Sequence, residues 1–183
     1  MPQENEIKLA LQDLRRTRQS LRTLGFRIQH ARVFELNIAL DDERGSLRTR
    51  GLLLRVRTAG KKVTCTYKGP ETAGVHKSRE EREFHADDAS ACLAVFEGLG
   101  FTPTFSYEKY RTEFARDGEP GIVTVDETPI GNFMELEGPA RWLDRTAKEL
   151  GYSRTDYITT SYGRLYEQWC EEYDADPTAM RFD

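Results

Sequence analysis

The sequence has little of several features that mark common classes of protein. Its 183 residues include three cysteines and three histidines, and none of them has the spacing of a metal site. It has no apolar run of 18 residues and no apolar segment near its start, which argues against a membrane span and an export signal. No glycine-rich phosphate loop is present, so any nucleotide must be held by side chains. We expect a cytoplasmic protein with reduced thiols and no membrane partner.

An excess of basic residues is also missing. Lys and Arg number 27 against 31 Asp and Glu, giving a net charge of −4, which argues against nucleic acid bound through a basic surface. The length suits one domain with a sizeable core. We expect that domain over residues 1–170, and we expect the acidic tail 171–183 to be frayed.

Charged residues instead recur at every second position of strand-like segments. Glu4, Glu6 and Lys8 share one face of an alternating strand, while Ile7 and Leu9 share the other. The pattern returns in about seven segments and supplies seven bases and eight acids. The bases are Lys8, Arg55, Arg57, Lys68, Arg79, Lys109 and Arg111, and the acids are Glu4, Glu6, Glu81, Glu83, Glu113, Asp126, Glu135 and Glu137.

A solvated sheet face would also be charged, but such faces usually mix in more Ser, Asn and Gln than these segments contain. A sheet that closes into a barrel would place all these groups in one cavity, because side chains alternate between inside and outside. Burying unpaired charges is costly, and a metal-bound polyphosphate would neutralise both sets. The apolar faces need helices outside, which we expect over 11–24, 87–100 and 139–151 and from residue 161.

These motifs, in this order, resemble the CYTH superfamily over residues 3–166. That superfamily includes class IV adenylate cyclases and thiamine triphosphatases, and its members are also called triphosphate tunnel metalloenzymes. The matching motifs are the E-x-E-x-K opening, Glu35-x-Asn37, Leu54-Arg55-x-Arg57, Tyr67-Lys68-Gly69-Pro70, Arg79-x-Glu81-x-Glu83, Lys109-x-Arg111, Asp126, the segment 131–137 and Ser161-Tyr162. The resemblance implies an α+β fold, a closed antiparallel eight-stranded β-barrel with helices packed on the outside.

The resemblance also implies a triphosphate substrate and Mg²⁺ or Mn²⁺, with charged residues of the lumen in three roles. We expect Glu4, Glu6 and Lys8 to be catalytic. The expected substrate-binding residues are Lys8, Arg55, Arg57, Lys68, Arg79, Lys109 and Arg111. The expected metal ligands are Glu4, Glu6, Glu81, Glu83, Asp126, Glu135 and Glu137.

The residues expected to hold the phosphates are compatible with more than one function. Water attacking the terminal phosphorus would make a phosphohydrolase, which we favour because hydrolysis needs less recognition. Attack by the ribose 3′-hydroxyl of ATP on the α-phosphorus would make an adenylate cyclase. A non-catalytic polyphosphate- or nucleotide-binding module is a third hypothesis. A homodimer is left open.

Overall fold

The structure, a computed structural model, describes residues 3–72 and 74–183, apart from the side chains of residues 3 and 4. The side chain of Glu4, an expected catalytic residue and metal ligand, thus lies outside the described residues. The strands are β1 (Gln3–Leu11), β2 (Arg27–Asp41), β3 (Leu53–Ala59), β4 (Lys62–Lys68), β5 (Lys77–Ala86), β6 (Thr102–Ala115), β7 (Ile122–Thr128), β8 (Gly131–Glu137) and β9 (Ala179–Met180). The helices are α1 (Leu14–Thr23), α2 (Ser46–Thr49), α3 (Ala89–Gly98), α4 (Ala140–Glu149) and α5 (Tyr162–Tyr173), with a 3₁₀ turn at Arg154–Asp156.

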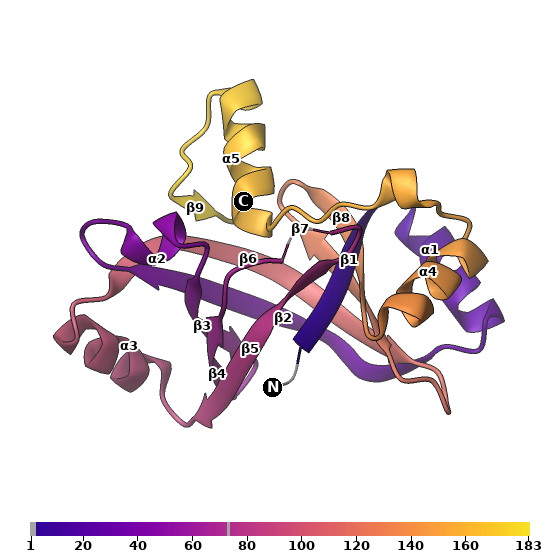
Figure 1. Cartoon of the computed structure of the whole chain (residues 1–183), viewed down its shortest axis with the longest axis horizontal. Helices are drawn as coiled ribbons and strands as arrows, with labels where there is room; N and C mark the ends of the chain where they lie inside the picture. Colours follow the sequence, from indigo (N-terminus) through magenta and orange to yellow (C-terminus); the bar gives the residue numbers. More distant parts are fainter. Residues whose placement is uncertain (1–2, 73) are drawn as a thin grey trace.

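Strands β1 to β8 form the closed barrel that the alternating charges predict. The strand order is β2-β3-β4-β5-β1-β8-β7-β6, and a further pairing of β2 with β6 closes the sheet. Every neighbouring pair in this ring is antiparallel. The predicted α+β fold with an eight-stranded barrel is therefore confirmed (Figure 1).

Helices pack on the outside of the barrel, where the apolar residues of the strands need cover. On one flank α1 and α4 lie side by side and bury Leu21, Trp142 and Leu143 against the outer faces of β1, β7 and β8 (Figure 1). On another flank α3 packs against the outer faces of β2, β3 and β4. Three of the expected helices thus form within a few residues of their predicted bounds, and the fourth begins at Tyr162. No helix in the described ranges is long and apolar enough to cross a membrane.

The fourth helix, α5, begins at the barrel and contacts its interior rather than its outer wall. Tyr162, in its first turn, packs with Tyr107 of β6 and Phe133 of β8, whose side chains alternate with outward apolar residues. The chain then turns back, and β9 pairs in parallel with β6. Part of the tail expected to fray is therefore ordered: Met180 is fully buried, because the Tyr166 hydroxyl holds the segment by donating to the carbonyls of Asp176 and Ala179.

Candidate active site

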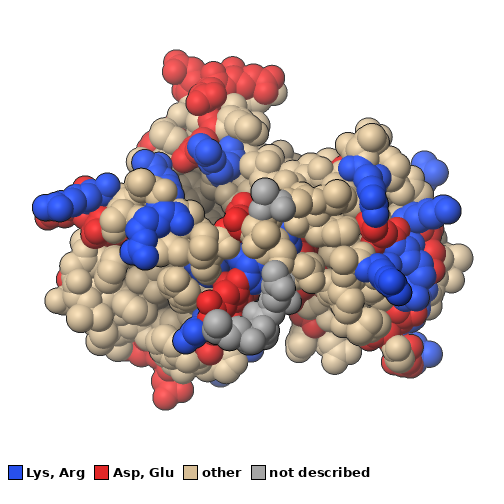
Figure 2. All heavy atoms as spheres, viewed as in Figure 1, with Lys and Arg blue, Asp and Glu red and all other residues tan. Residues whose placement is uncertain are grey.

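Contacts that skip a strand identify the interior face of the barrel. Arg55 on β3 donates to the Tyr107 hydroxyl on β6 at 3.2 Å, across β2. Arg111 on β6 donates to Glu135 on β8, across β7. Such contacts run through the lumen, since the outer faces of a closed barrel diverge. The charged face predicted by alternation is therefore the interior one, and Figure 2 shows basic and acidic side chains together near the hollow below α5.

Asp126 of β7 is the centre of one group of lumen charges. It has no exposed surface, and its carboxylate accepts hydrogen bonds from Lys109 at 2.9 Å and from Arg111 at 2.6 and 2.7 Å. The Tyr162 hydroxyl donates a further hydrogen bond to it at 2.8 Å. Lys109 also lies 3.7 Å from Glu35 of β2. One buried carboxylate thus fixes two cations of the lumen and the start of α5.

Lys8 of β1 lies beside this group. Its ammonium is 2.9 Å from Glu135 and 4.5 Å from the centre of the Tyr162 ring. One pleat away on the same strand, Glu6 accepts from Lys77 of β5 at 3.0 Å. Glu6 is also the direct partner of Glu137 in the register of β1 and β8. The structure therefore brings Glu6, Glu135 and Glu137 to neighbouring positions of two paired strands.

A second group of lumen charges lies on β3, β4 and β5. Glu83 accepts from the Thr66 hydroxyl at 2.7 Å and lies 3.7 Å from both Arg55 and Arg57. Arg55 in turn donates to Thr66 at 3.2 Å. On the same strands Lys68 is 2.7 Å from Glu81. The predicted bases here are paired with predicted acids.

Two other predicted residues lie toward the edges of this arrangement. Arg79 is 3.6 Å from Glu71 of the β4–β5 connection, and Glu71 is also 3.1 Å from Lys77. Glu113 of β6 is 2.9 Å from His30, whose side chain is 71% exposed, so this acid faces a solvated end of the barrel.

Two lumen carboxylates are held strongly in their ionised form. Burial and the neighbouring Glu135 oppose ionisation of Glu6, but the ammonium groups of Lys77, Lys68 and Lys8 outweigh them and lower its pKa to about 2. Burial likewise opposes ionisation of Glu35, and four lumen cations outweigh it and lower the pKa of Glu35 to about 2. In order of effect these cations are Lys109, Arg111, Arg57 and Arg55. The electrostatic potential around Glu6 and Glu35 is therefore positive enough to favour negatively charged groups.

The comparisons with known proteins agree with this geometry. The model of the CYTH domain family matches residues 2–162. The chain belongs to the CYTH family. A Methanocaldococcus jannaschii protein named "putative adenylate cyclase" is 30% identical over 135 residues, which are 73% of this chain and 75% of that protein.

Solved structures show the same fold at low sequence identity. A "putative adenylate cyclase" of Vibrio parahaemolyticus is 18% identical and aligns with a TM-score of 0.79 over 90% of this chain and 97% of that one. A Hippeastrum protein, described as a putative adenylyl cyclase with a dominant triphosphatase activity, is 18% identical. It aligns with a TM-score of 0.67 over 92% of this chain and 96% of that one.

The CYTH barrel also contains lumen residues that the sequence analysis did not assign to the site. Glu35 and Asn37 lie on the inward face of β2, and Lys77 begins β5 with a side chain that is 4% exposed. Tyr107 and Tyr162 contact Arg55 and Asp126 through their hydroxyls. Alternation could have identified Glu35, Asn37 and Lys77 from the sequence. Glu35 and Asn37 are two residues apart on one strand, and Lys77 is two residues before Arg79.

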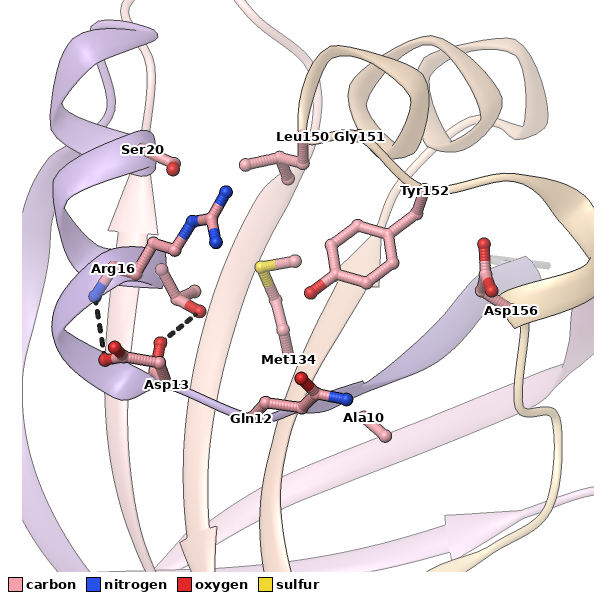
Figure 3. A pocket seen from close by; sticks show the side chains of 11 residues that line it. Ala10, Gln12, Asp13, Arg16, Ser20, Met134, Leu150, Gly151, Tyr152 and Asp156 are labelled. Carbon is pink, nitrogen blue, oxygen red and sulfur yellow. Dashed lines mark hydrogen bonds between the residues drawn. The ribbon is translucent and has the colours of Figure 1, made fainter.

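A cleft outside the CYTH barrel contains none of the predicted site residues. It has a volume of about 650 Å³ and lies between α1 and the segment after α4, where Arg16 and Tyr152 point toward it (Figure 3). Asp13 at its edge accepts from the backbone N–H groups of Arg15 and Arg16 and so caps α1. The charged lumen, and not this cleft, is the candidate active site.

The lumen carboxylates predict a specific dependence of stability on pH. A carboxylate whose pKa is lower in the folded protein stabilises the fold above its ordinary pKa of 4.5, and this contribution is lost as the pH falls toward 2. We expect the melting temperature to hold near neutral pH and to fall between about pH 4.5 and 2. In Glu35→Gln this fall should be shallower, as measured by thermal unfolding across pH 2–7. Glu80→Gln, on the outer face of β5, serves as the control, and equal slopes for both variants would contradict the expectation.

Proposed function

We propose that this CYTH protein is a divalent-metal-dependent phosphohydrolase that acts on a triphosphate bound in the lumen. The observation that carries the proposal is the set of buried and partly buried cations that five barrel strands direct into the lumen: Lys8, Arg55, Arg57, Lys68, Lys77, Arg79, Lys109 and Arg111. The arginines suit bidentate contacts with phosphate, and the lysines act as point charges. Fixed cations of this kind stabilise charge that develops on a transferred phosphoryl group.

The acids of the lumen fit a hard cation such as Mg²⁺ or Mn²⁺. Glu6 and Glu137 are direct partners on paired strands, and Glu135 is near enough to oppose the ionisation of Glu6. No group of three such ligands is already assembled among the described side chains, so these acids would have to come together around an ion that phosphate oxygens and water also coordinate. We propose that Glu6, Glu135 and Glu137 would hold the metal together with Glu4. When bound, it would neutralise phosphate charge and acidify a coordinated water.

The remaining predicted metal ligands lie on β5 and β7 and not on the paired strands β1 and β8. Asp126 has donors from Lys109, Arg111 and Tyr162, and Glu81 and Glu83 are paired with cations of β3 and β4. We propose that these three acids chiefly hold the phosphate-binding cations in place. In the hydrolysis itself, a water oxygen forms the new bond to the terminal phosphorus and the bridging P–O bond breaks. The products are orthophosphate and the shortened chain, and the proton of the water is released.

An adenylate cyclase is the second candidate, favoured by the name of the M. jannaschii relative. In that reaction the ribose 3′-hydroxyl of ATP would form the bond to the α-phosphorus, and pyrophosphate would leave. Hydrolysis is the preferred proposal because the cations described here all address phosphate groups, and hydrolysis needs no further recognition.

Product identification separates these functions. We expect orthophosphate when the protein is incubated with inorganic triphosphate, thiamine triphosphate or ATP in the presence of Mg²⁺ or Mn²⁺. Arg55→Ala should reduce the rate about 100-fold or more, because it removes a buried donor to the phosphate chain. Arg48→Ala is the control, since the side chain of Arg48 is 85% exposed on α2. Cyclic AMP and pyrophosphate from ATP at a comparable rate would establish the cyclase instead. Triphosphate binding without any product would instead identify the protein as a non-catalytic binding module.

A further inference from the structure

Several buried polar atoms in the described part of the chain have no hydrogen-bond partner, and two of them belong to one lumen residue. The side chain of Asn37 on β2 is fully buried, and neither its Oδ1 nor its Nδ2 is hydrogen-bonded. On the same face of the strand, Oε2 of Glu35 is also without a hydrogen bond. Leaving a buried amide unsatisfied destabilises a fold, so folding alone gives no reason to place an asparagine there.

The surroundings of Asn37 are those of the proposed phosphate site. In the sheet register Asn37 lies opposite Arg57 of β3 and Tyr107 of β6. Glu35, two residues away, lies opposite Lys109 and interacts with Arg55, Arg57 and Arg111. Leu36 and Ile38, the sequence neighbours of Asn37, face the outside of the barrel, where Leu40 packs against α3. The free amide is therefore directed among the cations that would hold a triphosphate.

An amide offers what these cations lack. Arginine and lysine side chains only donate hydrogen bonds, and they suit phosphate oxygens, which only accept. An attacking hydroxyl also needs an acceptor that orients its proton, and a carboxylate in this position would repel the phosphate. A neutral amide can donate to a phosphate oxygen and accept from the hydroxyl with the same side chain.

We propose that Asn37 contacts the reactants directly: Nδ2 donates to an oxygen of the phosphate chain, and Oδ1 accepts from the attacking hydroxyl. The inference rests on the proposed function, and it holds for water and for a ribose hydroxyl alike. Asn37 takes up no proton and exchanges no electrons. It aligns the O–H group with the phosphorus, so that its loss lowers kcat more than it weakens binding.

Asn37→Leu should separate this role from a structural one, because leucine has nearly the same size and no unsatisfied polar atoms. We expect the melting temperature to rise by roughly 2–4 °C as the unpaired amide disappears. We expect kcat with inorganic triphosphate to fall about 100-fold, while the Kd for triphosphate rises less than tenfold because the cations remain. Opposite signs for stability and activity are typical of a residue kept for function.

Thr112→Val is the matched control. The Thr112 hydroxyl is also buried and unpaired, but it lies on the outer face of β6, the face that carries Phe114. This variant should gain stability as Asn37→Leu does and keep its activity. An Asn37→Leu variant that folds and is at least as active as the wild type would overturn the inference. So would a folded variant with a lower melting temperature whose loss of activity only matches its unfolded fraction.

A second variant covers the case in which Asn37→Leu does not fold. Asn37→Asp adds a carboxylate beside the phosphate site, and we expect its Kd for inorganic triphosphate to rise at least tenfold at neutral pH. Unchanged binding in this variant would place Asn37 away from the phosphates and overturn the inference. A wild-type protein that turns over no triphosphate would refute the proposed function, whereas an active wild type with an active Asn37→Leu would refute only the role of Asn37.

Discussion

Glu6→Gln is expected to lower turnover about 100-fold or more while lowering the melting temperature only moderately, so that the protein stays folded. The substitution removes the charge through which Glu6 would bind a divalent cation, and the amide is a far weaker ligand for Mg²⁺ or Mn²⁺. The substitution also removes the stabilisation that ionised Glu6 gains from Lys77, Lys68 and Lys8. Two effects limit this loss. Lys77 keeps a second carboxylate partner, Glu71, at 3.1 Å, and the repulsion between Glu6 and Glu135 disappears.

The measurement is the rate of phosphate release across a range of Mg²⁺ and Mn²⁺ concentrations, together with a melting curve for each variant. Glu80→Gln is the matched control, since Glu80 lies on the outer face of the adjacent strand β5 and pairs with Arg82. It should behave as the wild type in both assays. Full activity in Glu6→Gln would remove Glu6 from the site, and a collapse of its melting temperature would show that the charge serves the fold.

The faces of the barrel strands could be predicted from the sequence because alternation is a local property. The position of Arg55 and Arg57 opposite Leu54 and Val56 follows from the geometry of a single strand, whatever its neighbours are. Closure followed from a physical argument, since an open sheet would leave a charged face without the usual neutral polar residues. The helices followed from the spacing of apolar residues, and in the structure Asp88 caps the start of α3.

The pairing of charges within the lumen could not be predicted, because it depends on which strands are neighbours and on contacts that cross the cavity. Arg111 contacts Glu135 across an intervening strand, so the two residues are not strand neighbours. Lys77 pairs with Glu71, which lies in the connection between β4 and β5, where no alternating pattern predicts its position. Glu35 and Asn37 were part of a recognised motif, but a motif does not state whether a polar atom is satisfied. Whether a buried polar atom is hydrogen-bonded can be decided only when the positions of all its potential partners are known.

The contacts of Asp126 give the second large expected effect. Asp126→Asn should destabilise the protein by roughly 3–5 kcal/mol, because it removes from a buried network the carboxylate that Lys109 and Arg111 share. For a chain of this size the melting temperature should fall by roughly 6–20 °C. Lys109 and Arg111 would lose their shared acceptor, and the new amide would direct donors toward them and toward Tyr162.

Asp144→Asn provides a control with the same chemistry in a different environment. The Asp144 side chain on α4 also has three partners, His76, Arg154 and Tyr157, but it is 29% exposed on the outside of the barrel. Water can compensate a lost charge there, so the loss of stability should be about 1 kcal/mol or less.

Melting curves recorded with a chelator and with added Mg²⁺ separate the two roles that Asp126 can have. If its carboxylate holds the cations in place, Asp126→Asn loses stability to the same extent in both conditions, because the network forms without a metal. If Asp126 were instead a primary metal ligand, the variant would match the wild type in the chelator and differ only with Mg²⁺. That second result would contradict the expectation, since the donors from Lys109, Arg111 and Tyr162 would then contribute little to the fold.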